Sequence, residues 1–223
     1  MLSYSTVVVG AFQVNCRIIA SQDKTRCAIA DPGDDPELVK NAVKRSGAKP
    51  VAVILTHGHL DHCGAAAEIA ALYGIPVFGP EAGDRQLLEH LDVQARMFGL
   101  ASKPALRPDL FLSDNGILDL NLGEEIRILH CPGHTPGQVC YYFKESGFLL
   151  SGDVLFRRSV GRSDFPGGDH DQLISSIRDN LLILPDDTAV LPGHGPDTTI
   201  GEEKLYNPFL SDFRHAKSRV RSR

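Results

Sequence analysis

The motif T-H-G-H-L-D-H constrains this chain more than any other feature of its sequence. It places four metal-ligand side chains, His57, His59, Asp61 and His62, within six residues. The motif follows directly on the apolar run Val51–Leu55, which has the composition of a strand buried on both faces of a sheet. A strand that ends abruptly in such a turn can present side chains to two neighbouring metal ions. We therefore expect the motif to lie at one edge of a sheet.

Three further candidate ligands lie far downstream, and each follows an apolar run of its own. They are His134, Asp153 and His194. Because rigid strands hold separate loops in register, loops at one edge of a sheet can bring all seven candidates together. Glycines flank the candidates, as tight turns and close backbone approach to a site require. Imidazole and carboxylate ligands without thiolates favour zinc, iron or manganese at a catalytic site over a closed structural zinc site.

Length and composition indicate one large domain. A chain of 223 residues with 42% hydrophobic content can bury roughly 70–75% of its unfolded surface, and no linker rich in Pro, Ser or Gly divides it. The net charge of −5 gives no reason to expect nucleic acid or an anionic membrane as a partner. No apolar run approaches the roughly 20 residues that a membrane-spanning helix needs.

The cysteines and the N-terminal residues favour a cytoplasmic location. The five cysteines are odd in number and lie mainly in apolar, strand-like settings, which fits reduced thiols. The N-terminus lacks the basic segment and long apolar segment of a signal peptide.

Apolar periodicity and turn residues predict a chain rich in strands with interspersed helices. We expect strands at Ser5–Val9, Val14–Ala20, Arg26–Ala30, Val51–Leu55, Pro76–Gly79, Ile117–Leu120, Glu125–His130, Val139–Phe143, Phe148–Ser151 and Ala189–Leu191. We expect helices at Pro36–Ser46, Ala65–Tyr73, Gln172–Leu184 and Ile200–Ser218, and a charged helical stretch that starts at Glu81 and runs to Leu100. Strands in two sets, each flanked by helices, predict an α/β sandwich of two sheets.

The ligand pattern resembles that of the metallo-β-lactamase fold superfamily, and the resemblance spans nearly the whole chain. It implies a four-layered αββα sandwich formed by a single domain over residues 1–223. By position, it also implies that one divalent metal ion is held by His57, His59 and His134. The second ion is then held by Asp61, His62 and His194, with Asp153 bridging the two. The metals implied are zinc, iron or manganese.

Within that superfamily, the segment G-D-V-L-F-R-R-S-V-G-R-S-D-F-P-G-G-D and the later T-T-I-G-E-E look like those of single-domain glyoxalase II-like hydrolases. Asp153 separates the chain from lactamases that carry a cysteine at this position. The resemblance implies hydrolysis of glutathione-type thioesters, with S-D-lactoylglutathione as the obvious candidate. Two-domain glyoxalase II has an additional helical region that helps to bind glutathione, and this chain ends before it. Arg162 stands where that enzyme has a lysine, and Asp164 where it has a tyrosine.

The expected mechanism follows from the metals. Two ions about 3.5–4 Å apart lower the pKa of a shared water and create hydroxide near neutral pH. Asp61 can both bind metal and orient this hydroxide, and a thiol with a pKa of about 8.5 can leave as thiolate with little acid catalysis. Arg162 can pair with a substrate carboxylate. Asp31, in the turn D-P-G, can orient a ligand histidine through a hydrogen bond.

Three other functions compete with this interpretation. A persulfide dioxygenase of the same fold uses one iron bound by two His and one Asp, and residues such as His59, His134 and Asp153 could supply that triad. A nuclease of the same fold needs a basic surface, which an acidic chain does not favour. A non-catalytic interaction protein does not need a full set of ligands.

Overall fold

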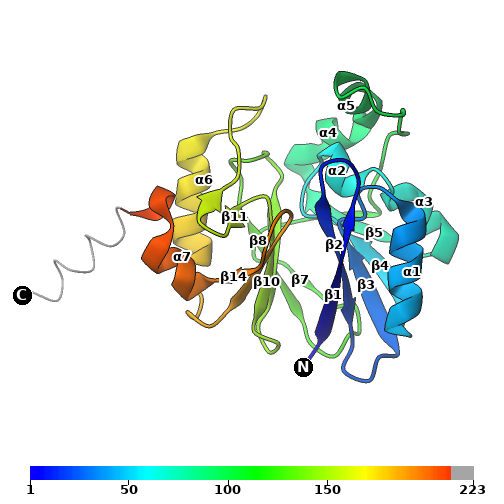
Figure 1. Ribbon diagram of the computed structural model, residues 1–223, viewed down its shortest axis with the longest axis horizontal. Coiled ribbons are helices and arrows are strands. Elements are labelled where there is room, and N and C mark those ends of the chain that lie inside the picture. The colour runs from blue at the N-terminus through cyan, green and yellow to red at the C-terminus, as the bar shows by residue number, and fades with distance from the viewer. Residues whose placement is uncertain (212–223) are drawn as a thin grey trace, which may run out of the picture.

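The computed structural model describes residues 1–211 as two six-stranded β-sheets packed face to face, with helices on both outer faces (Figure 1). The layers run helices, sheet, sheet, helices, which confirms the predicted αββα sandwich. In Figure 1, α1 and α3 cover one outer face and α6 and α7 cover the other.

The first sheet, sheet A, has the strand order β1-β2-β3-β4-β5-β6. Its strands are β1 Ser3–Val9, β2 Val14–Ala20, β3 Arg26–Ala30, β4 Lys49–Ile54, β5 Val77–Glu81 and β6 Leu110–Leu112. The first three strands pair antiparallel, and from β3 to β6 the pairing is parallel. The ends of β3 and β4 therefore lie at the same edge of the sheet.

The second sheet, sheet B, has the strand order β14-β13-β10-β9-β8-β7. Its strands are β7 Ile117–Leu118, β8 Ile126–His130, β9 Val139–Phe143, β10 Phe148–Gly152, β13 Ala189–Pro192 and β14 Thr198–Thr199. Only β10 and β13 pair in parallel. A separate hairpin consists of β11 Leu155–Phe156 and β12 Ser159–Val160.

The helices are short and are distributed between the two outer layers. They are α1 Pro36–Ser46, α2 Leu60–Cys63, α3 Ala66–Tyr73, α4 Arg85–Glu89, α5 Leu91–Met97, α6 His170–Ser176 and α7 Ile200–Tyr206. Short helices of other types are the 3₁₀ helices η1 Ala82–Asp84 and η3 Pro208–Leu210 and the π-helix η2 Ile177–Leu181. Helices α1 and α3 end at glycines in the left-handed conformation, Gly47 and Gly74.

Successive side chains along a strand point to opposite faces of its sheet. The buried side chains therefore form three layers, one between the two sheets and one between each sheet and its helices. On β2, Ile18 faces the helices α1 to α5, whereas Ile19 faces sheet B. On β10, Leu149 packs toward α6 and Leu150 packs between the sheets. Each sheet is thus covered on both faces, and its functional groups emerge at the edges.

Several predicted boundaries were wrong. The helix expected over Ile200–Ser218 ends at Tyr206, because Pro208 cannot continue it, and the last residues of that range lie outside the described part of the chain. The helix expected over Gln172–Leu184 begins earlier, at His170, and passes into the π-helix η2. The charged helical stretch expected from Glu81 to Leu100 consists of three short helices, η1, α4 and α5, and ends at Met97.

All five cysteines are free and buried, as expected for reduced thiols. None of the helices within residues 1–211 is long and apolar enough to cross a membrane.

A buried hydrogen bond links the two sheets below the edge that carries the candidate ligands. The Tyr141 hydroxyl on β9 donates to the carbonyl of Leu55, the residue after β4, at 2.7 Å. Tyr141 is completely buried. The bond therefore fixes the end of β4 against sheet B.

We expect Tyr141→Phe to destabilise the protein by about 1–3 kcal/mol, because the variant leaves a buried carbonyl without its donor. Urea denaturation would measure the change. Tyr142→Phe is the matched control, since the Tyr142 hydroxyl has no hydrogen-bond partner among the described residues. Equal stability of the two variants would contradict this role.

Candidate metal centre

The first four candidate ligands lie on a loop and a short helix that follow β4. His57 and His59 are on the loop, while Asp61 and His62 lie on α2. This helix was not predicted, because four residues are too few to show helical periodicity. The motif contributes to two neighbouring groups of candidate ligands, and the His57 and His62 rings lie side by side with centroids 4.1 Å apart.

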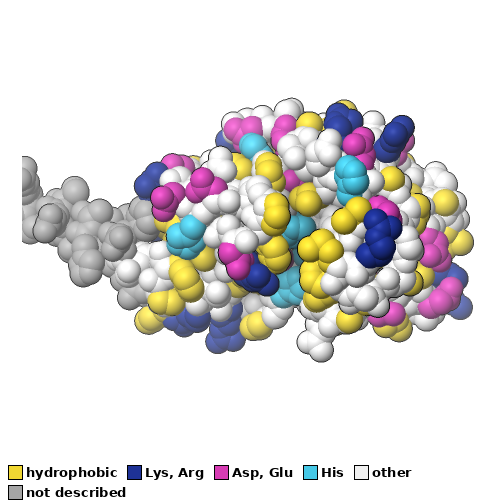
Figure 2. All heavy atoms as spheres, turned by 90° about the horizontal axis from the view of Figure 1, so that it is seen from above, with side chains coloured by type: hydrophobic (Ala, Val, Ile, Leu, Met, Phe, Trp, Pro, Cys, Tyr) yellow, Lys and Arg dark blue, Asp and Glu magenta, His cyan; other side chains and the backbone are white. Residues whose placement is uncertain are grey.

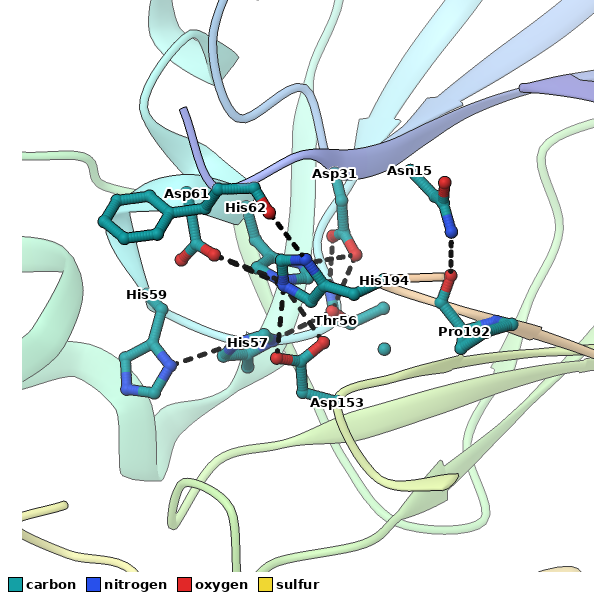
Figure 3. Close-up of polar contacts among 12 residues, drawn as sticks. Asn15, Asp31, Thr56, His57, His59, Asp61, His62, Asp153, Pro192 and His194 are labelled. Carbon is teal, nitrogen blue, oxygen red and sulfur yellow. Dashed lines mark hydrogen bonds and ion pairs between the residues drawn. The ribbon is translucent and has the colours of Figure 1, made fainter. Parts of the chain in front are cut away.

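The downstream candidates lie where three strands of sheet B end. His134 follows β8, Asp153 follows β10 and His194 follows β13. All seven predicted side chains meet at one edge of the sandwich, and Figure 3 shows how those from the two sheets point toward one another. Seen from above, histidine side chains lie at the bottom of a groove between two lobes (Figure 2).

The first group of ligands consists of three imidazoles whose inner nitrogens face one another. The Nδ1 atom of His59 lies 3.1 Å from His57 Nε2 and 3.0 Å from His134 Nε2. The Nδ1 atom of His134 lies 2.6 Å from the Arg162 carbonyl, which can only accept, so Nε2 of His134 carries a lone pair.

The hydrogen bond between His57 and Thr56 likewise shows which ring nitrogen of His57 carries the proton. The Thr56 hydroxyl donates to Asp31 and therefore accepts from His57 Nδ1 at 3.1 Å, which leaves a lone pair on His57 Nε2. Burial, followed by the nearby His62, lowers the pKa of His57 well below its usual value. Burial and His134 lower the pKa of His59 to about 4. At neutral pH, His57 and His59 are therefore neutral imidazoles, which is the form that binds metal.

In the second group, two imidazoles face two carboxylates. His62 Nδ1 donates to Asp31 at 3.0 Å, and His194 Nδ1 donates to the Phe12 carbonyl at 3.0 Å. The Nε2 atoms of these two histidines are thereby aimed inward, 3.4 Å apart. His194 Nε2 also lies 3.4 Å from Asp61 Oδ2. The predicted role of Asp31 as an orienting partner is confirmed.

The carboxylates make the second group more basic than the first. Burial lowers the pKa of His194, but hydrogen bonds to Asp153 and Asp61 outweigh it and raise the value to about 9. For His62, Asp153 and Asp61 likewise outweigh burial, and its pKa lies well above the usual value. Without a bound metal ion, protons on these two histidines balance the charge of the neighbouring carboxylates. A metal cation at the same place would balance that charge instead.

Asp153 lies between the two groups. Its carboxylate oxygens are 3.6 Å from His134 Nε2, 3.4 Å from His62 Nε2 and 3.5 Å from His194 Nε2. Burial raises the pKa of Asp153, but the neighbouring imidazoles His62 and His194 hold it well below its usual range. Its Oδ1 atom is buried and has no hydrogen-bond partner within residues 1–211. A buried, ionised oxygen that makes no hydrogen bond and has the His62 imidazole 3.4 Å away as its counter-charge fits a cation.

The donor set as a whole fits divalent metal ions. Three groups of side chains have ligand atoms that lie within 4.8 Å of one another. These groups are His57, His59 and His134; His57, His62 and Asp153; and Asp61, His62 and His194. All donors are imidazole nitrogens or carboxylate oxygens, a set that suits zinc, iron or manganese.

Asp84 supports the first group and was not predicted from the sequence. Its buried carboxylate accepts hydrogen bonds from Gly58 N at 2.8 Å, Thr135 Oγ1 at 2.8 Å and Gly137 N at 2.6 Å. It thus ties the loop of His57 and His59 to the loop of His134. An aspartate in G-D before a helix resembles an ordinary capping residue, so the sequence carries no signal for this role.

Arg162, the candidate substrate-binding residue, lies at the rim of the groove. Its guanidinium is exposed, pairs with Asp164 at 3.0 Å and stacks on the Phe165 ring at 4.2 Å. Arg158 is instead engaged by α7, where it pairs with Glu202 and stacks on Tyr206. Substrate contact by Arg162 stays a prediction.

The sandwich and the donor set together are those of a metal-dependent hydrolase. The chain belongs to the Metallo-beta-lactamase superfamily, whose family model matches residues 9–194.

Relatives and solved structures match over almost their full length. The chain is 43% identical to hydroxyacylglutathione hydrolase GloC of Haemophilus influenzae, over 94% of this chain and 99% of the relative. The crystal structure of BLEG-1 B3 metallo-beta-lactamase has a TM-score of 0.87 and 38% identity, over 94% of this chain and 100% of that one. The structure of TTHA1623 in a di-iron-bound form has a TM-score of 0.83 and 40% identity, over 92% and 100%. ETHE1 from Myxococcus xanthus, at 23% identity, a TM-score of 0.73 and coverage of 95% and 90%, shares the fold.

We expect Gly193→Ala to weaken metal binding by more than about tenfold while the fold is retained. A Cβ atom at this position would lie 2.3 Å from Asp153 Oδ1 and 2.5 Å from His62 Cε1, so both side chains would have to move. Metal content after dialysis and far-UV circular dichroism would measure the two effects. Gly147→Ala is the control, because Gly147 has the same left-handed backbone, with a φ of +71°, but lies in the turn between β9 and β10, where a Cβ would meet nothing within 4 Å. Wild-type metal affinity in Gly193→Ala would contradict the packing described.

Proton release should distinguish the two groups of ligands. At pH 7, His59, with a pKa of about 4, is already neutral, whereas His194, with a pKa of about 9, is protonated. Binding of metal at the second group must therefore displace protons, and its apparent affinity should fall as the pH is lowered from 9. We expect at least about one proton per chain to be released at pH 7. Metal titration of the metal-free protein in weak buffer with a pH indicator measures this, and release of no proton across two equivalents would contradict the account.

Proposed function

We propose that the protein is a binuclear metal-dependent hydrolase of glutathione-type thioesters, with S-D-lactoylglutathione as the candidate substrate. The observation that carries this proposal is Asp153, an ionised carboxylate within 3.6 Å of inward-facing nitrogens from both groups of ligands. The similarity to a hydroxyacylglutathione hydrolase over nearly the full length of both chains supports the choice of substrate.

In this proposal, each group of ligands holds one divalent ion. His57, His59 and His134 hold the first, and Asp61, His62 and His194 hold the second. Asp153 bridges both ions. Zinc, iron or manganese would suit the ligands, and the di-iron form of TTHA1623 supports iron as one possibility.

Bound metal ions supply a Lewis acid for the thioester carbonyl and lower the pKa of a water between them. The residues of the chain provide orientation. Burial raises the pKa of Asp61, but His62 and the hydrogen bond with His194 together outweigh it and keep the pKa below normal. Asp61 is therefore ionised at neutral pH and can accept a hydrogen bond from the attacking water. Asp31 and the Phe12 carbonyl hold the protons of His62 and His194 on the outer nitrogens.

The leaving group makes a thioester the best match to this site. Hydrolysis forms a bond from the water oxygen to the acyl carbon and breaks the carbon–sulfur bond, which yields an acid and a thiol. A thiol with a pKa of about 8.5 can leave as thiolate without a strong proton donor. An amide nitrogen, including that of a β-lactam, needs a proton as it leaves.

The alternative function, an iron-dependent persulfide dioxygenase, is not favoured. The structure of ETHE1 is only 23% identical to this chain and shows the fold alone. A dioxygenase with one iron also gives no role to the second group of ligands, in which Asp61 and His194 lie 3.4 Å apart.

We expect the metal-loaded protein to hydrolyse S-D-lactoylglutathione without oxygen uptake, and Asp153→Ala or His59→Ala to lose more than about 100-fold in kcat/KM, because each removes a proposed ligand. Thiol release, oxygen consumption and metal content would be measured on the same preparations. Asp187→Ala and His90→Ala, at two exposed positions, are the matched controls and should keep full activity.

Two other substrates complete the experiment. Oxygen consumption that depends on a glutathione persulfide would support the dioxygenase, and turnover of a cephalosporin in place of the thioester would support a lactamase. Near-normal thioester hydrolysis by metal-free Asp153→Ala would overturn the assignment of the site.

A further inference from the structure

An exposed pair of phenylalanine rings lies beside the second group of ligands. Phe12, in the loop between β1 and β2, and Phe98, directly after α5, meet edge to face with ring centroids 5.0 Å apart. Their exposed fractions are 39% and 51%. Two large apolar side chains that contact each other in solvent form a surface suited to an apolar ligand.

Hydrogen bonds to the metal-binding loops hold both rings in place. The Phe12 carbonyl accepts the Nδ1 proton of His194 at 3.0 Å, so the Phe12 backbone lies in direct contact with a candidate ligand. Helix α5, which leads into Phe98, is fixed to the loop of His59 through Gln94. The Gln94 side chain accepts from Leu60 N at 2.9 Å and donates to Gly58 O at 3.2 Å.

The surroundings of the first group of ligands have a different character. Phe165 lies 5.3 Å from His59, and its ring carries the exposed guanidinium of Arg162 at 4.2 Å. Figure 2 shows hydrophobic side chains on both sides of the groove above the histidines. The first group of ligands is therefore bordered by a cation on an aromatic ring, and the second by the uncharged pair of rings.

This asymmetry matches the two arms of a glutathione thioester. The glutathione arm carries two carboxylates, and one of them can replace Asp164 as the partner of the exposed Arg162 guanidinium, since a guanidinium binds carboxylates well. The acyl arm extends in the other direction from the carbonyl and reaches the two phenylalanines. An apolar acyl group gains contact there, and an aromatic one also gains a favourable ring geometry.

We propose that Phe12 and Phe98 form an acyl-binding subsite that selects 2-hydroxyacyl groups with an aromatic or other large apolar substituent. The proposal rests on the proposed thioester hydrolysis and adds the class of acyl group to it. The chemistry at the carbonyl is the same for every acyl group, so the subsite acts through binding alone.

A matched pair of substrates tests the subsite. S-mandeloylglutathione and S-lactoylglutathione share the 2-hydroxyacyl carbonyl and the thiol, and differ only in a phenyl ring in place of a methyl group. We expect the wild-type protein to favour the mandeloyl compound in kcat/KM by about twofold to tenfold, the range of an added aromatic contact.

Phe98→Ala should reduce this ratio to about one, because it removes a ring without touching the carbonyl that holds His194. Phe98→Leu keeps an apolar side chain without a ring and should give an intermediate ratio; it also serves if the alanine variant fails to fold. Phe209→Ala is the control, since Phe209 has a similar exposed fraction of 49% and lies in η3, away from the groove. It should keep the wild-type ratio.

The outcomes separate the subsite from the function on which it rests. A ratio that falls in Phe98→Ala but not in Phe209→Ala supports the subsite. Hydrolysis of both thioesters with a ratio unchanged in Phe98→Ala overturns the subsite and leaves the proposed function standing. Failure of the metal-loaded wild-type protein to hydrolyse either thioester overturns the proposed function itself.

Discussion

The structure depends on a set of imidazole nitrogens and carboxylate oxygens that are held facing one another. Each ligand histidine with an assigned proton donates it outward, to Asp31, Thr56 or a backbone carbonyl, so that its free nitrogen is turned inward. Asp153 adds a buried, ionised carboxylate at the centre. Such an arrangement costs free energy unless a cation or a proton neutralises it. The fold must therefore enforce this arrangement, and the donor set that results fits metal ions.

Contacts between the two sheets provide that enforcement. The loop of His194 follows β13 of sheet B, yet the side chains of Asn15 and Arg17 on β2 of sheet A donate to the carbonyl of Pro192, the last residue of β13. Asn15 also donates to Gly195 O, on the other side of His194. Asp84 performs the equivalent task for the first group of ligands. Because each group draws ligands from both sheets, any slip of one sheet against the other would separate the groups.

Sequence reasoning predicted the fold class and placed all seven ligand candidates at one edge, because apolar runs ending in Gly-flanked His or Asp are visible in one dimension. It also predicted β2, β3, α1 and β9 to the residue. It could not predict α2, which is four residues long, or the extent of the helix after Thr199. The link made by Asp84 and the contact of Phe12 with Phe98 were also missed, because partners far apart in the sequence leave no periodic signal.

The account's central claim is that the edge of the sandwich holds two metal ions bridged by Asp153. Anomalous diffraction from crystals of the metal-loaded protein tests it most directly. The account predicts two peaks about 3.5–4 Å apart, one among His57, His59 and His134 and the other among Asp61, His62 and His194, with Asp153 in contact with both. A single fully occupied peak at saturating metal, with neither Asp61 nor His194 in contact with a metal ion, would contradict it.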